Sequence, residues 1–499
     1  LRDVYKRQHL RLVLPLTYLD DRAEASLRSI AAQHFSGLAV TILCFGNKDD
    51  QALLQMLGSI PAEVRAVASW SEVTHLMHSF AEPWVVLTDG YTMLNEEFSA
   101  EIIARIKARP RADIILVDDD WHRADDRLQQ PHFKPEWSRE LLLSTDYFGG
   151  VYTVRKALLD GLKSSCTTTS GWLWELALHV ATKTDRIERI PRILAHRSME
   201  RYAAELGQAQ NEMCRVMQHT FNKLGSNARI ETPAWAIEHN RLVCQPRFPD
   251  QGPRVAIIIP TKNQHQLVKR CIDSIRTTTY QNYQIYLVDN ESDDPGSLAY
   301  FESLATQGVQ ILRISNPADE FSYSYVNNRA TEQTQGEEYL LFLNNDTEVI
   351  EPRWLSQMVG WQQLPAVGSV GARLLFPNNR VQHAGITHRL LYNVLPAPSL
   401  KCEPGDKGGY QDYLYLNRDS AAQTAACLLT PRSTFIHYGM FDEGLFAVAY
   451  NDCDYGFKLT QAGLHNVYCA DAVLYHHEGY SRGIGQGNDK LSEEAAFVR

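Results

Sequence analysis

The chain has 499 residues, which is long for one domain and enough for two or three. With 44% hydrophobic and 22% charged residues, it has the composition of an ordinary globular protein, which excludes a disordered, collagen-like or fibrous chain. The formal net charge of −10 argues against nucleic-acid binding, because phosphate recognition needs clustered positive charge.

The start of the chain and its cysteines indicate where the protein resides. No apolar stretch approaches about 18 residues, and no long apolar segment follows the charged first residues. The nine cysteines are widely spread and include no CxxC pair, so we expect buried thiols in a reducing compartment instead of disulfides or a zinc site. We therefore expect a cytoplasmic protein. Residues 1–8 match nothing that follows and are expected to be a non-native leader.

The chain contains an internal repeat. Residues 11–15 and 254–260 are apolar strands that end in proline, and each is followed by a helical pattern and a second apolar strand, at 40–44 and 285–289. Further on, the strand ending at Asp89 parallels the one ending at Asp346, and His196 parallels His476. The pattern predicts an α/β fold with two tandem domains of one type, at 9–200 and 253–499, joined by a helical connecting segment at 201–252.

Polar residues follow several strands of the second half. In open α/β sheets, ligands bind at the carboxyl ends of the strands. Asp289 there could bind a nucleobase or ribose, although taken alone it is more often a helix-cap or turn aspartate. Asn344-Asn345-Asp346 suits a divalent cation, or else an Asx turn. Asp452 opens a helix and could be a base or simply a cap.

Eight segments of the second half, taken together, resemble family 2 glycosyltransferases of bacterial surface-polysaccharide and O-antigen synthesis, of the rhamnosyltransferase kind. These segments are PTKN (260–263), VDNES (288–292), FSYSYVNN (321–328), LNNDTEV (343–349), QHAG (382–385), FDEGLF (441–446), NDCD (451–454) and HHEGYSRG (476–483). The resemblance covers about 253–483 and implies two tandem GT-A-like (Rossmann-like) domains. No Gly-rich phosphate loop stands at a strand end, which argues against a nucleotidyltransferase, a dinucleotide enzyme or a P-loop enzyme.

The resemblance also implies a role for particular residues. Asp346 and His476 would bind Mn²⁺ or Mg²⁺, and Asp452 would be the general base. The nucleotide-sugar, a UDP- or dTDP-sugar, would be bound by Pro260, Thr261, Asp289, Asn345 and Arg482. Asn344 stands where the family usually has an acid, which leaves one carboxylate ligand.

The first half lacks several of these groups. Cys44 stands at the position of Asp289, and Leu173 falls near Asp452. Asp118-Asp119-Asp120 is expected to be the turn after a strand. We therefore expect a degenerate, non-catalytic first domain.

The function expected from the resemblance is a metal-dependent inverting glycosyltransferase that acts on a lipid-linked glycan acceptor at the inner face of the membrane. Peripheral membrane association and truncation at the C-terminus are also expected. Two alternatives stay open: a non-catalytic glycan-binding scaffold, and a bifunctional enzyme with two active domains.

Overall fold

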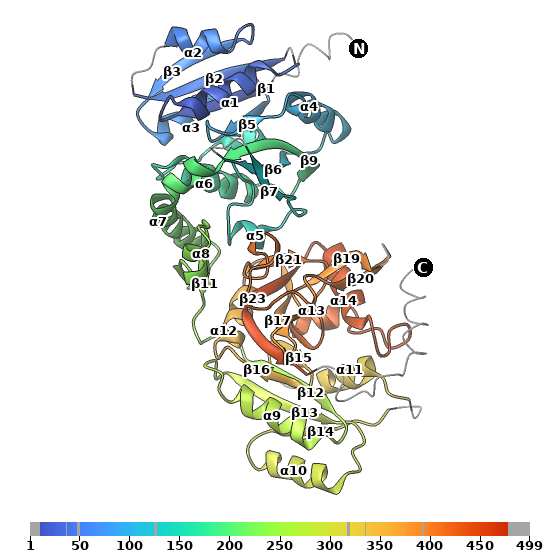
Figure 1. Cartoon of the computed structure of the whole chain (residues 1–499). Coiled ribbons are helices and arrows are strands. Elements are labelled where there is room, and N and C mark those ends of the chain that lie inside the picture. Colours follow the sequence, from blue (N-terminus) through green and yellow to red (C-terminus); the bar gives the residue numbers. More distant parts are fainter. Residues whose placement is uncertain are drawn as a thin grey trace. The chain divides into compact units, whose positions relative to one another are not determined.

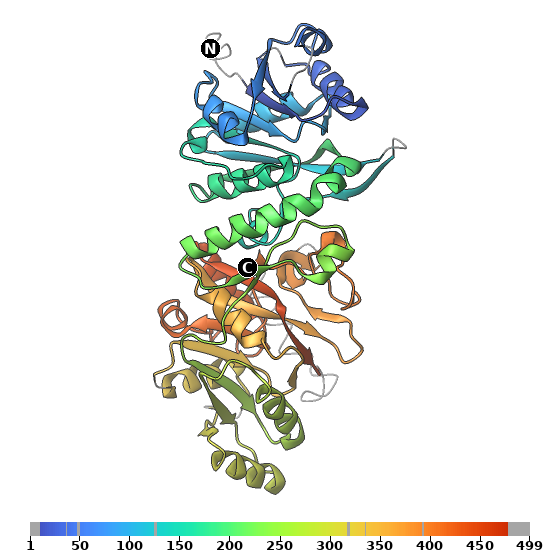
Figure 2. The ribbon, with the colours of Figure 1, turned by 90° about the vertical axis from the view of Figure 1, so that its left-hand side faces the viewer.

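The structure is a computed structural model, and it describes residues 10–35, 37–46, 50–123, 127–316, 320–334, 336–391 and 394–477. It divides into two compact units, the first formed by Leu1–Thr220 and Ile230–Pro246 and the second by Phe221–Arg229 and Arg247–Arg499. The expected connecting segment 201–252 is therefore shared between the units. Most of its long helix α7 (Met199–Lys223; Figure 2, green) belongs to the first.

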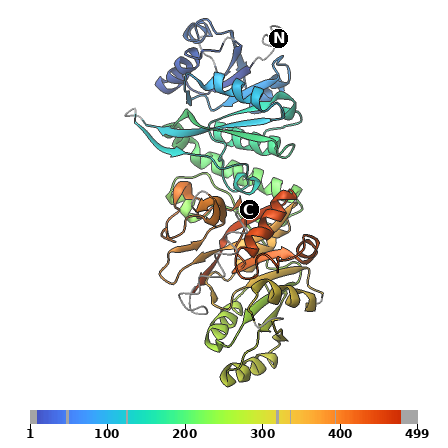
Figure 3. The ribbon, with the colours of Figure 1, turned by 90° about the vertical axis from the view of Figure 1, so that its right-hand side faces the viewer.

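The first unit is built on a nine-stranded mixed sheet (Figure 1) with the order β3-β2-β1-β4-β8-β6-β9-β5, and β7 pairs with β6 as a hairpin that Figure 3 shows in teal. The strands are β1 (Leu10–Leu16), β2 (Leu38–Phe45), β3 (Ala62–Val67), β4 (Trp84–Thr88), β5 (Met93–Leu94), β6 (Ile114–His122), β7 (Leu128–His132), β8 (Val151–Arg155) and β9 (Ile187–Ser198). The helices besides α7 are α1 (Asp21–Ala31), α2 (Asp50–Met56), α3 (Trp70–His78), α4 (Phe98–Ala108), α5 (Arg139–Leu142), α6 (Thr169–Ala181) and α8 (Ala234–Glu238), with a 3₁₀ turn η1 at Lys156–Leu159. Two short strands, β10 (Arg229–Glu231) and β11 (Gln245–Arg247), lie where the chain passes between the units.

The second unit repeats this sheet. Its ten strands run in the order β14-β13-β12-β15-β22-β17-β23-β16, with β18 paired to β17 and β21 to β23. The strands are β12 (Val255–Thr261), β13 (Tyr283–Asp289), β14 (Gln310–Arg313), β15 (Tyr339–Leu343), β16 (Thr347–Val349), β17 (Val367–Leu375), β18 (Val381–His383), β21 (Arg418–Ser420), β22 (Cys427–Pro431) and β23 (His465–His476), beside a separate pair, β19 (Ile386–Leu391) and β20 (Leu395–Pro398). The helices are α9 (His265–Ile275), α10 (Pro295–Ala305), α11 (Tyr323–Gln333), α12 (Trp354–Gln362), α13 (Arg432–His437) and α14 (Asn451–Gln461), with a 3₁₀ turn η2 at Tyr410–Asp412.

The nine strands of the first sheet each have a counterpart in the second, which adds β21, and the register shows the match residue by residue at the first two strands. Leu16 lies opposite Cys44 at the end of β1 and β2, and Thr261 lies opposite Asp289 at the end of β12 and β13. The predicted fold class of two tandem α/β domains of one type is confirmed. Cys44 indeed occupies the place of Asp289.

Local sequence explains the helices that position the strand ends. In the first unit α1 begins after Asp20, whose carboxylate accepts hydrogen bonds from the N–H groups of Arg22 and Ala23. Its apolar residues Leu27 and Ile30 are fully buried in one cluster with alternate residues of β1. In the second unit α9 buries Val268, Cys271, Ile272 and Ile275 at helical spacing, as predicted.

Among the described residues, we find no helix that combines the length and the apolar character needed to cross a membrane.

The nine cysteines are all free thiols and most are buried, as expected, but Cys402 is exposed and two thiols form a pair. Cys214 Sγ on α7 lies 4.0 Å from Cys244 Sγ and 3.4 Å from Gln210 Nε2. The hydrogen bond with Cys244 is the largest of the effects that lower the pKa of Cys214 to about 6. Burial raises the pKa of the Cys244 thiol, so Cys214 is the more nucleophilic thiol of this pair.

At pH 7 we expect Cys214 to react with iodoacetamide before Cys402, because the thiolate is the nucleophile. Cys244→Ala should slow that reaction roughly tenfold, since it removes the main stabilising contact. Peptide mass spectrometry over a labelling time course measures both rates. Faster labelling of Cys402, or an unchanged rate in Cys244→Ala, would contradict this assignment.

Candidate active site

Four residues predicted to bind a nucleotide-sugar gather at one edge of the second sheet. Pro260 and Thr261 close β12, Asp289 closes β13 opposite Thr261, and Asn345 follows β15. Asn345 Nδ2 donates a hydrogen bond to Thr261 Oγ1 over 2.9 Å, which ties the two strand ends together. Asp289 Oδ1 accepts from the N–H of Ser292 at 3.0 Å, which orients the carboxylate.

The predicted metal pair also comes together. The antiparallel pairing of β16 with β23 sets Thr347 opposite His476, and this places Asp346 Oδ1 3.1 Å from His476 Nε2. Both side chains are nearly buried, with 4% and 5% exposure. Asp346 Oδ1 and His476 Nδ1 have no hydrogen-bond partner among the described residues.

A buried carboxylate oxygen without a hydrogen bond, facing an imidazole nitrogen, fits a divalent cation. Among the described residues, no group of three or more His, Cys, Asp or Glu could hold a metal ion. A cation bound by Asp346 and His476 would therefore need further oxygen ligands from its substrate or from water, which is the usual state of Mg²⁺ at phosphate sites.

Asn344 takes part in this site, although the sequence suggested only a lost acid. Its Nδ2 lies 3.3 Å from His476 Nε2, and its Oδ1 accepts from the hydroxyl of Tyr323 at 3.4 Å. The same hydroxyl lies 3.0 Å from the carbonyl oxygen of Ala425. The sequence does not reveal the contacts of Tyr323, because Tyr323 opens α11 whereas Asn344 follows the next strand, β15.

Asp452 lies in the first turn of α14, where backbone groups hold both of its oxygens. The N–H of Ala425 donates to Oδ2 at 3.0 Å and the N–H of Cys453 donates to Oδ1 at 2.8 Å. Burial raises the pKa of Asp452, and these hydrogen bonds act in the opposite direction. Since Tyr323 contacts both Asn344 and Ala425, one side chain connects the metal pair with the segment that holds Asp452. Arg482, the remaining predicted ligand, lies outside the described residues.

The corresponding sheet edge of the first unit carries different residues. Met93 lies opposite His196 just as Thr347 lies opposite His476, so Thr92 takes the place of Asp346. Asp89, which the sequence pairs with Asp346, directly follows β4 and corresponds to Asn344. The Asp89 carboxylate is satisfied by the N–H groups of Tyr91 and Thr92 and by Thr92 Oγ1 at 2.8–2.9 Å.

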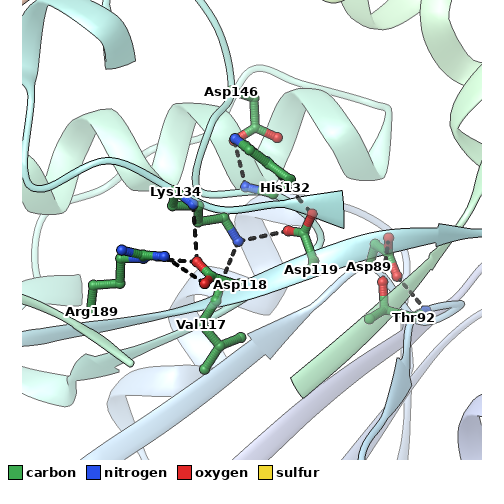
Figure 4. A network of polar contacts seen from close by, with 10 residues as sticks. Asp89, Thr92, Val117, Asp118, Asp119, His132, Lys134, Asp146 and Arg189 are labelled. Atoms are coloured by element: carbon green, nitrogen blue, oxygen red, sulfur yellow. Dashed lines mark hydrogen bonds and ion pairs between the residues drawn. The ribbon is translucent and has the colours of Figure 1, made fainter. Parts of the chain in front are cut away.

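The three consecutive acids of the first unit are not a turn, because they lie inside β6 and are buried. Figure 4 shows two of them, Asp118 and Asp119, with their partners. Each of the three acids has a cationic or imidazole partner, which disfavours a metal there. The pairs are Asp118 with Arg189, Asp119 with Lys134 and Asp120 with His196, each at 2.6 Å.

The base position also differs. Helix α6 corresponds to α14, and neither Ser170, its second residue, nor Leu173, the predicted counterpart of Asp452, carries a carboxylate. The carbonyls of Gly150 and Ala426 accept from the residues that follow β4 and β15, so Gly149 corresponds to Ala425. The N–H of Gly149 donates to Asp146 Oδ1 at 3.2 Å. A carboxylate from another element therefore occupies this contact in the first unit.

Asp146 makes the first unit sensitive to pH. Burial raises its pKa to about 6 despite the nearby Arg197. The folded state therefore keeps this proton to a higher pH than the unfolded chain, and the stability of the unit falls as pH rises through about 4 to 6. We expect Asp146→Asn, which cannot ionise, to raise the Tm at pH 8 and to lose that advantage at pH 4. Differential scanning calorimetry tests this, and an equal Tm difference at both values would refute it.

Helix α7 covers the end of β1 in the first unit. The Arg201 guanidinium lies 5.2 Å from the centroid of the Tyr18 ring and 4.7 Å from that of Tyr91, and it pairs with Asp20. Tyr91 donates or accepts a 2.8 Å hydrogen bond with Thr17 Oγ1, directly after β1. In the first unit, the end of β1 is thus covered by side chains of that same unit. The corresponding strand end in the second unit is that of β12, which carries Thr261.

Comparison with known proteins identifies the second unit. Residues 256–413 match the family model described as glycosyl transferase family 2. The chain is 31% identical over 434 residues to the uncharacterized protein y4gI of Sinorhizobium fredii, covering 83% of this chain and 46% of that protein. It is 32% identical over 394 residues to the O-antigen biosynthesis protein RfbC of Myxococcus xanthus, covering 77% and 30%.

A third relative is the O-antigen chain rhamnosyltransferase RfbN of Salmonella typhimurium, 22% identical over 229 residues, covering 46% of this chain and 68% of that protein. The chain spans less than half the length of y4gI and RfbC. The matched segment 256–413 contains the ends of β12, β13 and β15, where the predicted ligands gather. The second unit of this chain therefore carries a glycosyl transferase family 2 domain, as its motifs predicted.

Proposed function

We propose that the second unit is a metal-dependent inverting glycosyltransferase that moves a sugar from a nucleotide-diphospho-sugar to a glycan acceptor. The observation that carries this proposal is the pairing of Asp346 with His476, 3.1 Å apart and buried, at the sheet edge where Thr261 and Asp289 close their strands. The relative named for O-antigen biosynthesis supports bacterial cell-surface polysaccharide synthesis as the pathway class.

The donor would lie across the ends of β12, β13 and β15. Asp289 offers a fixed carboxylate oxygen to a base N–H or a ribose hydroxyl, and Asn345 and Thr261 offer polar groups beside it. One acidic residue suits a UDP- or dTDP-sugar equally well. Arg482 would contact the diphosphate.

Asp346 and His476 would hold Mn²⁺ or Mg²⁺ beside that diphosphate. A divalent cation there neutralises the charge that develops on the leaving group. The fixed hydrogen bonds of Asp452 hold its carboxylate in one orientation before substrate arrives.

Asp452 would act as the general base. It removes the proton of an acceptor hydroxyl as that oxygen bonds to C1 of the sugar, and the bond between C1 and the diphosphate oxygen breaks. The proton ends on Asp452 and the electron pair on the nucleoside diphosphate. A single displacement from the opposite face inverts the anomeric centre, so no nucleophilic carboxylate is required.

The first unit would be non-catalytic. Leu16 and Cys44 replace Thr261 and Asp289, Thr92 replaces Asp346, and the N–H groups around Asp89 satisfy its oxygens. The alternative of two active domains has one observation in its favour, which is the position of Asp146 at the N–H of Gly149. The loss of the other groups outweighs it.

The acceptor would be a lipid-linked glycan, reached from the cytoplasmic side by peripheral association with the membrane. This part of the proposal rests on the relatives in O-antigen synthesis.

Calorimetric titration of UDP, dTDP and GDP, with and without Mn²⁺, tests the proposal. We expect one Mn²⁺-dependent site per chain for one of these nucleotides. Two sites would support the bifunctional alternative. Absence of binding for all three would favour a glycan-binding scaffold.

A further inference from the structure

A second histidine, His383, lies in the same buried region as the proposed metal pair. It ends β18 and is fully buried. Its ring Nε2 lies 3.1 Å from Gln423 Oε1, and its Nδ1 has no hydrogen-bond partner among the described residues. A buried ring nitrogen without a partner is costly, so it needs an explanation.

The neighbours of His383 fix its tautomer. Gln423 Nε2 donates to Ser420 Oγ at 2.5 Å and to the carbonyl of Asn466 at 3.1 Å, so the amide oxygen must be the group that faces His383. His383 Nε2 therefore carries the hydrogen and Nδ1 is an acceptor. Burial lowers the pKa of His383 to about 4, so the ring is neutral near pH 7.

The proposed function itself fixes the tautomer of His476. A ring nitrogen that binds a metal supplies its lone pair, so Nε2 of His476, which lies 3.1 Å from Asp346 Oδ1, would carry no hydrogen. The hydrogen is then on Nδ1, which is buried and also without a partner among the described residues.

The two rings are on one face of the sheet. Leu374 on β17 lies opposite His383 on one side and Leu474 on the other, and His476 follows Leu474 by two residues on β23. One ring has an unused acceptor and the other an unused donor.

We propose that His383 is a positioning residue for His476, whose Nδ1–H it binds through its own Nδ1 by way of one bridging water. This contact would keep Nε2 of His476 unprotonated and directed at Asp346. Histidines that bind metals commonly donate their other N–H to such a partner, and loss of the partner typically weakens metal binding about 10–100-fold. The inference rests on the proposed function, because it assigns His476 to the metal.

The first unit has a matched histidine with a different partner. His132 ends β7 as His383 ends β18, and its Nδ1 lies 3.6 Å from Asp119 Oδ1. In the first unit, where Thr92 stands at the position of Asp346, the partner of this ring is therefore a carboxylate.

Two substitutions at His383 separate the ring nitrogens. The oxygen of His383→Asn can replace the Nδ1 acceptor but loses Gln423, whereas His383→Gln keeps a polar group near Gln423 and loses that acceptor. We expect His383→Gln to weaken Mn²⁺ binding at least about tenfold, and His383→Asn to change it by less than about threefold. Electron paramagnetic resonance of free Mn²⁺, titrated into the full chain, measures the affinity, and the Tm of each variant reports folding.

A second measurement tests the link to His476. In a His476→Ala background, His383→Gln should have no further effect on Mn²⁺ affinity, because the group that it positions is absent. Equal effects of Gln and Asn, a stronger effect of Asn, or a full effect in the His476→Ala background would each overturn the role of His383. If the wild type bound no Mn²⁺, the proposed function itself would fail and this inference with it.

Discussion

Asp452→Asn is expected to reduce sugar transfer by about 10²–10⁴-fold while nucleotide binding stays within about twofold of the wild type. Asparagine has nearly the same shape, and its oxygen can still accept the hydrogen bond that the N–H of Ala425 donates over 3.0 Å, while its NH2 group gives up the bond from Cys453. It cannot take a proton from an acceptor hydroxyl. Initial rates with a radiolabelled donor, set beside calorimetric nucleotide binding, measure the two effects separately.

The pH dependence of the wild type should report the same group. Because burial raises the pKa of Asp452, the rate should begin to fall at a higher pH than an exposed aspartate would give as the solution is acidified. The residual activity of Asp452→Asn should lack that acidic limb. An acidic limb that persists in the variant would show that another group is the base.

Asp454→Asn is the matched control for Asp452→Asn. Asp454 lies on the same first turn of α14, but it pairs with Lys458 at 2.6 Å, one turn further along the helix. We expect less than about threefold loss of rate, in keeping with the small contribution of a partly exposed ion pair. A loss as large as that of Asp452→Asn would contradict the choice of base.

Asp346→Ala is expected to abolish the Mn²⁺ dependence of nucleotide binding and to weaken that binding at least about tenfold, equivalent to about 1.4 kcal/mol. The substitution removes the carboxylate that lies 3.1 Å from His476 Nε2. Calorimetry with and without Mn²⁺ measures the loss. If nucleotide binding by the variant depended on Mn²⁺ as it does in the wild type, Asp346 would be excluded as a metal ligand.

Glu348→Ala provides the control for Asp346→Ala. Glu348 lies two residues later on β16 and also pairs with a histidine, His477, at 3.0 Å, but it is only partly buried. Removing it deletes a carboxylate–imidazole pair from the same strands without touching the proposed metal ligands. We expect Mn²⁺-dependent binding to be unchanged.

A loss of activity after substitution of Asp89 in the first unit has to be separated from a loss of folding. Asp89 accepts three hydrogen bonds in the turn after β4, and an alanine Cβ at Gly150 would lie 2.6 Å from its Oδ2. Asp89→Ala would therefore disturb the fold of the first unit even if that unit is non-catalytic. A loss of activity in such a variant is informative only when its Tm matches that of the wild type.

The sequence alone determined the repeat, the α/β class and the strand ends that carry polar groups. Apolar runs that end in Pro260, Asp289 and Asn344 are patterns of buried parallel strands, and the ends of such strands meet at one edge of a sheet. Proximity of Thr261, Asp289 and Asp346 could thus be predicted from residues far apart in the chain. Contact with His476 required the resemblance, because it lies over a hundred residues further on.

The tertiary structure alone decided which groups those residues bind. The register of β5 against β9 decides whether Asp89 corresponds to Asp346 or to Asn344. One inserted or deleted residue is enough to shift that register. The acids of β6 were mistaken for a turn because three adjacent carboxylates rarely lie buried in a strand. Here Lys134, Arg189 and His196 pair with the three carboxylates. Lys134 follows β7, and Arg189 and His196 lie on β9. Side-chain partners that are distant in sequence, such as Tyr323 with Asn344 or Gln423 with His383, leave no local pattern, since only the folded sheet brings them within hydrogen-bond distance.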